Sequence, residues 1–145
     1  MAKKTDVTLL AARIGVALIF LLSGVGKMAG WSGAVTHAAS RGVPAILLAG
    51  ATALEILGAI SLIAGWRMRW GAAALLAFLV PVTLVFHDFW AAQGAEVQIQ
   101  TIQFLKNVAM GGGLLAVIGA GPGAFSVDAW RARREERGPP ARLAA

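Results

Sequence analysis

Four long apolar stretches, separated by short polar segments, dominate the hydrophobic pattern of the chain. They cover about residues 7–27, 44–66, 70–87 and 99–121. At a helical rise of about 1.5 Å per residue, roughly 20 residues cross a hydrocarbon core of about 30 Å, and each stretch has about that length. The pattern therefore predicts an all-α integral membrane protein in which four spanning helices form a bundle.

The segment from Trp31 to Gly42 separates the first stretch from the second. It is rich in small and polar residues, includes His37 and Arg41, and is too short and too polar to cross a membrane. We interpret it as a short interfacial or re-entrant segment between the first two spanning helices.

The chain becomes basic after the fourth stretch. We therefore divide it into a membrane domain, residues 1–125, and a basic cytoplasmic tail, residues 126–145. Two interpretations of the tail remain open. It forms either a surface helix from Val127 to Arg142, with Trp130 in lipid and its arginines on anionic head groups, or a solvated tail that only enforces the topology.

The positions of Lys and Arg predict the orientation in the membrane. They gather at the N-terminus, in the turn between the second and third stretches, and in the tail, whereas residues 87–100 contain Asp88 and Glu96 but no Lys or Arg. Because Lys and Arg are enriched in cytoplasmic segments, we expect both termini inside the cell. The tryptophans, which prefer the membrane interface, fall at the predicted span ends: Trp31, Trp66, Trp70, Trp90 and Trp130.

Composition excludes several classes of function. A hydrophobic fraction of 58% with 14% charged residues is too apolar for a water-soluble fold, so the lipid bilayer is the first partner. The net charge of +6 is spread over span ends rather than one patch, which argues against a nucleic-acid partner. The chain has no Cys, so it forms no disulfide, thiol redox couple or Cys-ligated metal site. Because Arg13 interrupts the first apolar stretch and three further stretches follow, we expect a retained helix rather than a cleaved signal.

A few polar side chains lie within the predicted spans. An ionisable residue there costs about 2.5 to 3.5 kcal/mol, so each should face the bundle interior and find a partner. Helical spacing places the two cations of the first span on one stripe, a carboxylate near the middle of the second, and a Lys-Asn pair on the fourth. The candidate site residues are Arg13, Lys27, Glu55, His87, Lys106 and Asn107.

Two interpretations of this set remain open. In the first, Glu55 forms a structural ion pair with Lys106 or Arg13 that neutralises buried charge and fixes the helix register. In the second, a polar pocket opens outward, holds a small polar head group and exchanges protons with it; its lining is Lys27, Glu55, His87, Lys106 and Asn107. We predict no metal site.

The same residues belong to an ordered set of motifs that resembles the DoxX family of small bacterial membrane proteins. The motifs are Arg13 with Phe20–Lys27 (FLLSGVGK), Gly42–Pro44 (GVP), Glu55 with Gly65–Arg67 (GWR), Phe86–Trp90 (FHDFW), and Lys106–Asn107. The resemblance covers about residues 13–121. It implies a four-helix bundle whose chain crosses the bacterial inner membrane several times. It also implies an association with oxidoreductases that pass electrons to quinones. It assigns no chemical role to the matching residues.

Three functions follow as hypotheses. The first is a membrane subunit of an oxidoreductase with a redox partner protein, in which Lys106 or His87 binds a carbonyl oxygen of a quinone and Glu55 relays protons. The second is a non-catalytic anchor or assembly factor whose basic tail docks a cytoplasmic partner. The third is a small proton-coupled transporter that uses the carboxylate of Glu55.

Overall fold

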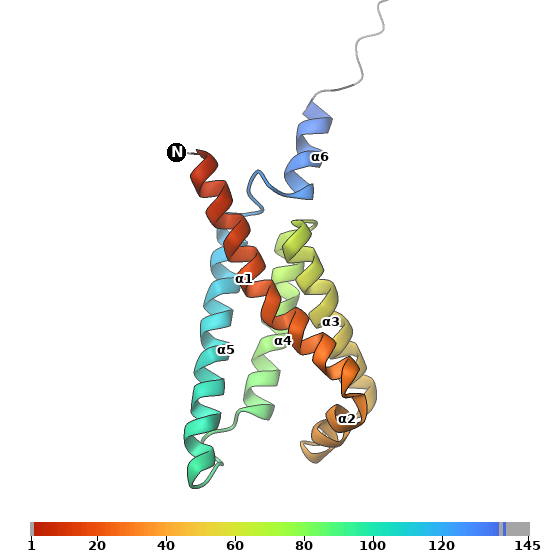
Figure 1. The fold of residues 1–145 in the computed structure, drawn as a ribbon, viewed down its shortest axis with the longest axis vertical. Helices are drawn as coiled ribbons and strands as arrows, with labels where there is room; N and C mark the ends of the chain where they lie inside the picture. The colour runs from red at the N-terminus through yellow and green to blue at the C-terminus, as the bar shows by residue number, and fades with distance from the viewer. Residues whose placement is uncertain (1, 137, 139–145) are drawn as a thin grey trace, which may run out of the picture.

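The computed structural model describes residues 2–136 and residue 138, and over these residues it is built of helices joined by short turns (Figure 1). Of the described helices, α1, α3, α4 and α5 have the length and apolar composition needed to cross a bilayer, which confirms the predicted all-α, four-span architecture. The helices are α1 (Ala2–Ala29), α2 (Trp31–Ser40), α3 (Ala45–Ala64), α4 (Met68–Phe86), α5 (Ala95–Ala120) and α6 (Val127–Glu136).

The helices extend beyond the apolar stretches that predicted them. Helix α1 begins at Ala2 and α5 at Ala95, several residues before the predicted spans. Backbone hydrogen bonding continues through polar flanks, whereas hydropathy marks only the part that suits lipid. The segment after the first span contains α2, a helix of 10 residues that is too short to cross, and its place at the interface stays a prediction.

The spanning helices pack in a simple order. Helix α3 lies against α1 and α4, and α5 lies against α4 and α1. Both ends of the described chain lie at one end of the bundle, which we name the α6 end, whereas α2 and the α4–α5 loop lie at the opposite α2 end (Figure 1). An even number of spans requires this arrangement. Which end faces the cytoplasm stays a prediction.

The buried core occupies the half of the bundle nearer the α6 end. Gly58 on α3 permits close packing there, because a Cβ atom at that position would lie 2.6 Å from Leu75 Cγ on α4. The core residues are Ala17, Phe20, Ala59, Leu62, Ala72, Leu75, Leu79 and Leu114. Toward the α2 end this core stops, and a cavity takes its place.

Two carboxylates fasten the segment between α5 and α6 to the bundle. Asp6 Oδ1 on α1 accepts a hydrogen bond of 2.9 Å from the backbone N–H of Ala124. Asp128 accepts from the N–H groups of Arg67 and Met68, at 2.9 and 3.2 Å, where α4 begins. Arg67 has a φ of +46°, a strained value for a residue with a side chain, and the Asp128 contacts stabilise this turn.

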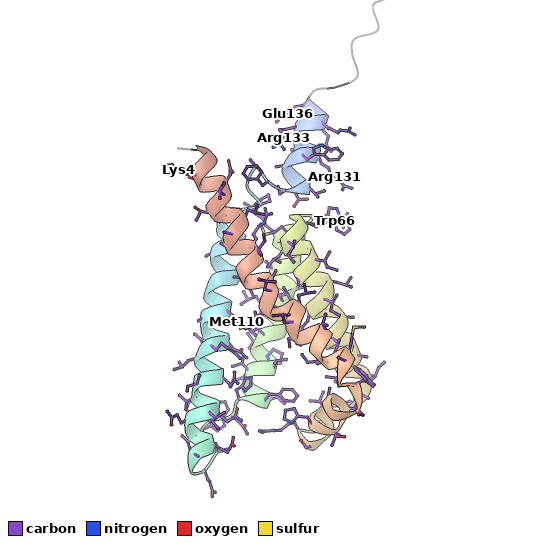
Figure 2. All side chains as sticks on the ribbon, in the orientation of Figure 1. Lys4, Trp66, Met110, Arg131, Arg133 and Glu136 are labelled. Carbon is purple, nitrogen blue, oxygen red and sulfur yellow. The ribbon has the colours of Figure 1, made fainter. Side chains whose placement is uncertain are left out.

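Helix α6 rises from this fastened segment at the α6 end, and Figure 2 shows Arg131, Arg133 and Glu136 on the part beyond the bundle. The guanidinium of Arg134 lies 4.3 Å from the centre of the Trp130 ring, so the indole carries a cation on its face. Helix α6 begins at Val127, the residue at which the first interpretation of the tail started a helix. The remainder of the predicted tail, residues 137 and 139–145, lies outside the described residues.

Candidate functional site

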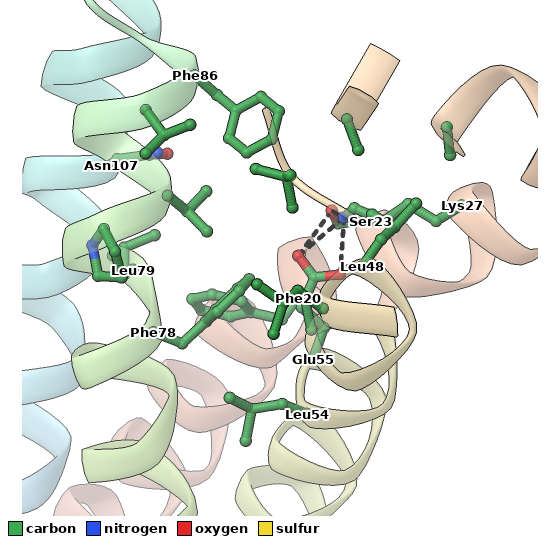
Figure 3. A pocket seen from close by; sticks show the side chains of 18 of the residues that line it. Phe20, Ser23, Lys27, Leu48, Leu54, Glu55, Phe78, Leu79, Phe86 and Asn107 are labelled. Atoms are coloured by element: carbon green, nitrogen blue, oxygen red, sulfur yellow. Dashed lines mark hydrogen bonds and ion pairs between the residues drawn. The ribbon is translucent and has the colours of Figure 1, made fainter. Parts of the chain in front are cut away.

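A cavity of about 1040 Å³ lies between the helices toward the α2 end. Residues of α1, α2 and α3 form one side, and residues of α4 and α5 form the other. Most of the wall is aliphatic or aromatic, and Figure 3 shows Phe20, Leu54, Phe78, Leu79 and Phe86 around it. Such a lining suits the apolar part of a ligand.

An ion pair between Lys27 and Glu55 forms the polar part of one wall. Lys27 Nζ lies 2.9 Å from Glu55 Oε1 and 2.7 Å from Oε2. The Glu55 side chain is 6% exposed and that of Lys27 is 26% exposed, so the carboxylate is almost fully enclosed. A buried carboxylate keeps its charge only with such partners, and this pair therefore explains how Glu55 is accommodated in the bundle.

Ser23 completes the group on this wall. Its hydroxyl donates to Glu55 Oε1 over 3.1 Å and accepts a hydrogen bond of 2.6 Å from Lys27 Nζ. Ser23 and Lys27 are four residues apart on α1, so both side chains lie on the same face of the helix (Figure 3). The three side chains form one short hydrogen-bonded chain at the cavity.

The partner of Glu55 differs from both partners that the sequence predicted, Lys106 and Arg13. Lys27 is the last residue of the predicted first span, so helical rise alone places it near the membrane surface, and this estimate ignores the long flexible stem of a lysine. The close approach of α1 to α3 shortens the gap further, since a Cβ atom on Gly24 would lie 2.7 Å from Ile56 Cγ1. Lys27 therefore reaches inward to the carboxylate.

Arg13 lies outside the cavity, near the α6 end. It is 1% exposed, and its guanidinium donates to the backbone carbonyl oxygens of Ile63 at 3.3 Å, Phe125 at 2.8 Å and Pro122. The stripe on α1 correctly turns Arg13 and Lys27 toward other helices. However, these residues are 14 positions apart, or about 21 Å along the helix, so they serve opposite halves of the bundle.

The remaining candidates line the α4–α5 side. Asn107 is buried and donates to Thr83 Oγ1 over 3.0 Å, which joins the two helices. His87 Nδ1 lies 3.1 Å from Gln100 Oε1. Lys106 is exposed at the cavity and donates to the side-chain oxygen of Gln103, one turn earlier on α5. Five of the predicted site residues line this cavity: Lys27, Glu55, His87, Lys106 and Asn107.

Sequence reasoning missed the residues that border the α2 end of the cavity. The ring of His37 on α2 lies 5.5 Å from that of Phe86 on α4. Arg41 Nη1, directly after α2, lies 2.8 Å from Asp88 Oδ1 in the α4–α5 loop. The opposite charges of Arg41 and Asp88, in segments predicted on the same side of the membrane, were a signal for this contact.

Fold and cavity together define a small multi-pass membrane protein whose spanning helices line a mostly apolar cavity with an ion pair in its wall. The chain belongs to the DoxX family, whose sequence model matches residues 8–88. It is 37% identical over 124 residues to the inner membrane protein YphA of Escherichia coli K12, covering 84% of this chain and 89% of that protein. It is also 32% identical over 128 residues to the inner membrane protein YqjF of the same organism, covering 88% and 95%.

These similarities confirm the family and the multi-pass inner-membrane location that the sequence predicted. No solved structure gives a significant match to the chain. The names of both relatives state a location and no reaction, so the chemistry has to be argued from the cavity.

Proposed function

We propose that this protein binds a lipophilic molecule with a small polar head group in the cavity, and that the ligand is a quinone serving an oxidoreductase. One observation carries the proposal: a mostly apolar cavity of about 1040 Å³ contains the Lys27–Glu55 ion pair in its wall. Sites for small molecules and cofactors combine a large apolar lining with a few placed polar groups in this way.

The lining fits both parts of a quinone. Phe20, Phe78 and Phe86 offer apolar and aromatic surface to a ring and its tail. Lys106 and His87 supply nitrogen groups that bind a carbonyl oxygen, and the contact with Gln100 orients the His87 ring.

A quinone bound in the cavity would supply reversible transfer of electrons and protons. The protein's part is to hold the ring, limit water and carry protons along the Lys27, Ser23 and Glu55 group, whose hydrogen bonds are continuous. Because the chain has no Cys, the electrons must come from a partner protein rather than from a thiol of this chain.

The test is to purify the protein in native lipid discs and identify the small molecules that copurify by extraction and mass spectrometry. We expect a quinone in the wild type, and its loss from the folded variants Glu55→Gln and Lys106→Met. Arg131→Met, which removes an exposed cation from α6, is the matched control and should retain it. If no sample contains a ligand and added quinone gives no thermal stabilisation, the proposal is wrong.

The transporter hypothesis has less support from the same geometry. Exchange of a proton for a cation needs a carboxylate that a cationic substrate can reach, whereas both oxygens of Glu55 are bonded to Lys27. Lys27 and Lys106 would also repel a cation in the cavity. Proteoliposome uptake that responds to a pH gradient would restore this hypothesis.

The anchor hypothesis is favoured by a different observation. Helix α6 is fastened to the bundle through Asp128 and exposes Arg131 and Arg133 beyond it, as a docking element would. Deleting residues 130–145 leaves Asp128 in place and removes these arginines. The measurement is the phenotype of cells that carry each variant. If the deletion gives the phenotype of a strain without the protein while Glu55→Gln and Lys106→Met give that of the wild type, the anchor hypothesis replaces the quinone proposal.

A further inference from the structure

The charges that line the cavity do not balance among the described residues. Glu55 is engaged by Lys27 and by Ser23, so the carboxylate and the Lys27 ammonium neutralise each other. Lys106 also lines the cavity, and of the described residues it contacts Gln103 and no carboxylate. One positive charge therefore remains in excess.

The position of Lys106 makes this excess charge costly. It lies 7 residues after the start of the apolar stretch at residue 99, or about 10 Å along the helix, which places it inside the span. An unpaired cation inside the hydrocarbon core is costly because lipid cannot solvate its charge. Lysines near helix ends avoid the cost by extending to water, but this distance exceeds the reach of the side chain.

The hydrogen bond of Lys106 leaves its ammonium able to bind an anion. Gln103, which does not line the cavity, accepts one hydrogen bond from the ammonium of Lys106, and two of the three N–H donors of this ammonium remain for a ligand. Two other polar groups on this side have uncharged partners: Asn107 donates to Thr83, and one ring nitrogen of His87 contacts Gln100. Lys106 is therefore the charged group of the cavity wall that no described carboxylate neutralises.

We propose that the ligand of this cavity is an anionic amphiphile, whose acidic head group pairs with Lys106 while its apolar part lies between the aromatic walls. The inference rests on the proposed function and narrows its ligand class, from lipophilic molecules in general to lipophilic acids. A quinone with an acidic hydroxyl group has this chemistry, and so does an anionic phospholipid. Lys106 is then the residue that determines specificity.

A matched pair of ligands tests the charge directly. The first is a hydroxynaphthoquinone that carries an alkyl chain beside its acidic hydroxyl, and the second is its methyl ether, which has the same ring and chain but no charge. Binding to the full-length protein is measured in discs of zwitterionic lipid. We expect the wild type to bind the acid about tenfold more tightly than the ether, as a charge-assisted hydrogen bond provides.

Variants of Lys106 assign the preference to its charge. Lys106→Met should bind both compounds more weakly than the wild type and with similar affinity, whereas Lys106→Arg should retain the preference for the acid. Arg131→Met, with its change on α6, should behave as the wild type.

The outcomes separate this inference from the function on which it rests. If neither compound binds the wild type above empty discs, the proposed function fails and the inference fails with it. If the wild type binds both compounds equally, or if Lys106→Met retains the preference, the cavity binds lipophiles but the anionic class is wrong.

Repeating the measurement in discs that contain phosphatidylglycerol identifies the source of the anion. Loss of the preference for the acid shows that an anionic bilayer lipid competes for Lys106, and an unchanged preference shows that a free lipophilic acid is selected over lipid. Both results support pairing of an anion with Lys106.

Discussion

Arg41 and Asp88 join the end of α2 to the α4–α5 loop through an ion pair of 2.8 Å. The contact connects the two sides of the cavity at the α2 end, where the ring of His37 also meets that of Phe86. Helix α2 also packs against α1 and α3. We therefore expect the ion pair to affect how easily a ligand enters or leaves the cavity at this end.

Breaking the Arg41–Asp88 pair should accelerate ligand exchange with little loss of stability. Both side chains are partly exposed, and such pairs contribute about 0 to 1 kcal/mol to folding. We expect Asp88→Asn to raise the dissociation rate of a bound ligand in stopped-flow measurements. The charge exchange Arg41→Asp with Asp88→Arg should restore the slow rate, and equal rates in all forms would contradict this role.

The Lys27–Glu55 pair should stabilise the bundle as a unit. Lys27→Met leaves a buried carboxylate without its cation, which costs about 3 to 5 kcal/mol for pairs of this kind. The double variant Lys27→Met with Glu55→Gln should lose less than the sum of the single changes. Unfolding in mixed micelles measures this coupling, and strictly additive losses would show that the pair is not coupled.

Gly58 is predicted to tolerate no added methyl group. A Cβ atom there would lie 2.6 Å from Leu75 Cγ, and Leu75 is fully buried and cannot move aside. Overpacking of this kind costs about 1 to 3 kcal/mol, so Gly58→Ala should lower the unfolding temperature. Gly15→Ala is the matched control, because a Cβ atom at Gly15 meets nothing within 4 Å; equal effects of the two changes would refute the explanation.

Arg13 should control the order of the segment between α5 and α6. Lysine in its place keeps the charge but loses the planar fork that donates to the carbonyl oxygens of Pro122 and Phe125. We expect faster hydrogen exchange of the amides of residues 123–128 in Arg13→Lys. Protection equal to that of the wild type would mean that Asp6 and Asp128 hold the segment without Arg13.

The predicted orientation can be measured because the chain has no native Cys. A cysteine introduced at exposed Ala91, in the α4–α5 loop, should react with a membrane-impermeant maleimide in intact cells. A cysteine at exposed Ala132, on α6, should react only after the cells are opened. The reverse result would place both termini outside the cytoplasm.

The sequence predicted the parts of the architecture that depend on solvent. Lipid requires long apolar helices, and the cost of exposing charged or polar groups to lipid explains why Arg13, Lys27, Glu55 and Asn107 face other helices. These are local consequences of residue type and helical spacing. These predictions agree with the structure because the packing of the helices against one another does not change which residues face lipid.

The pairing of these side chains could not be predicted in the same way. Lys27 reaches Glu55 because α1 and α3 approach closely at Gly24, a property of the helix contact rather than of the spacing along α1. Arg13 binds carbonyl groups more than 100 residues away, in a Gly-rich and Pro-rich segment with no periodic pattern. The cavity exists because the core stops short of the α2 end, which no single helix encodes.

The contacts of Arg13 with Pro122 and Phe125 can form only late in the synthesis of the protein. Helix α1 enters the membrane first and carries the guanidinium of Arg13 with it. Pro122 and Phe125, whose carbonyl oxygens accept from this guanidinium, leave the ribosome only after all the spanning helices have been made. Until then the nascent chain carries an incompletely bonded cation, at a cost of about 2.5 to 3.5 kcal/mol if it remains at membrane depth. Arrival of the last segment removes this penalty, so a chain that stops early keeps a defect that a membrane protease or chaperone can recognise.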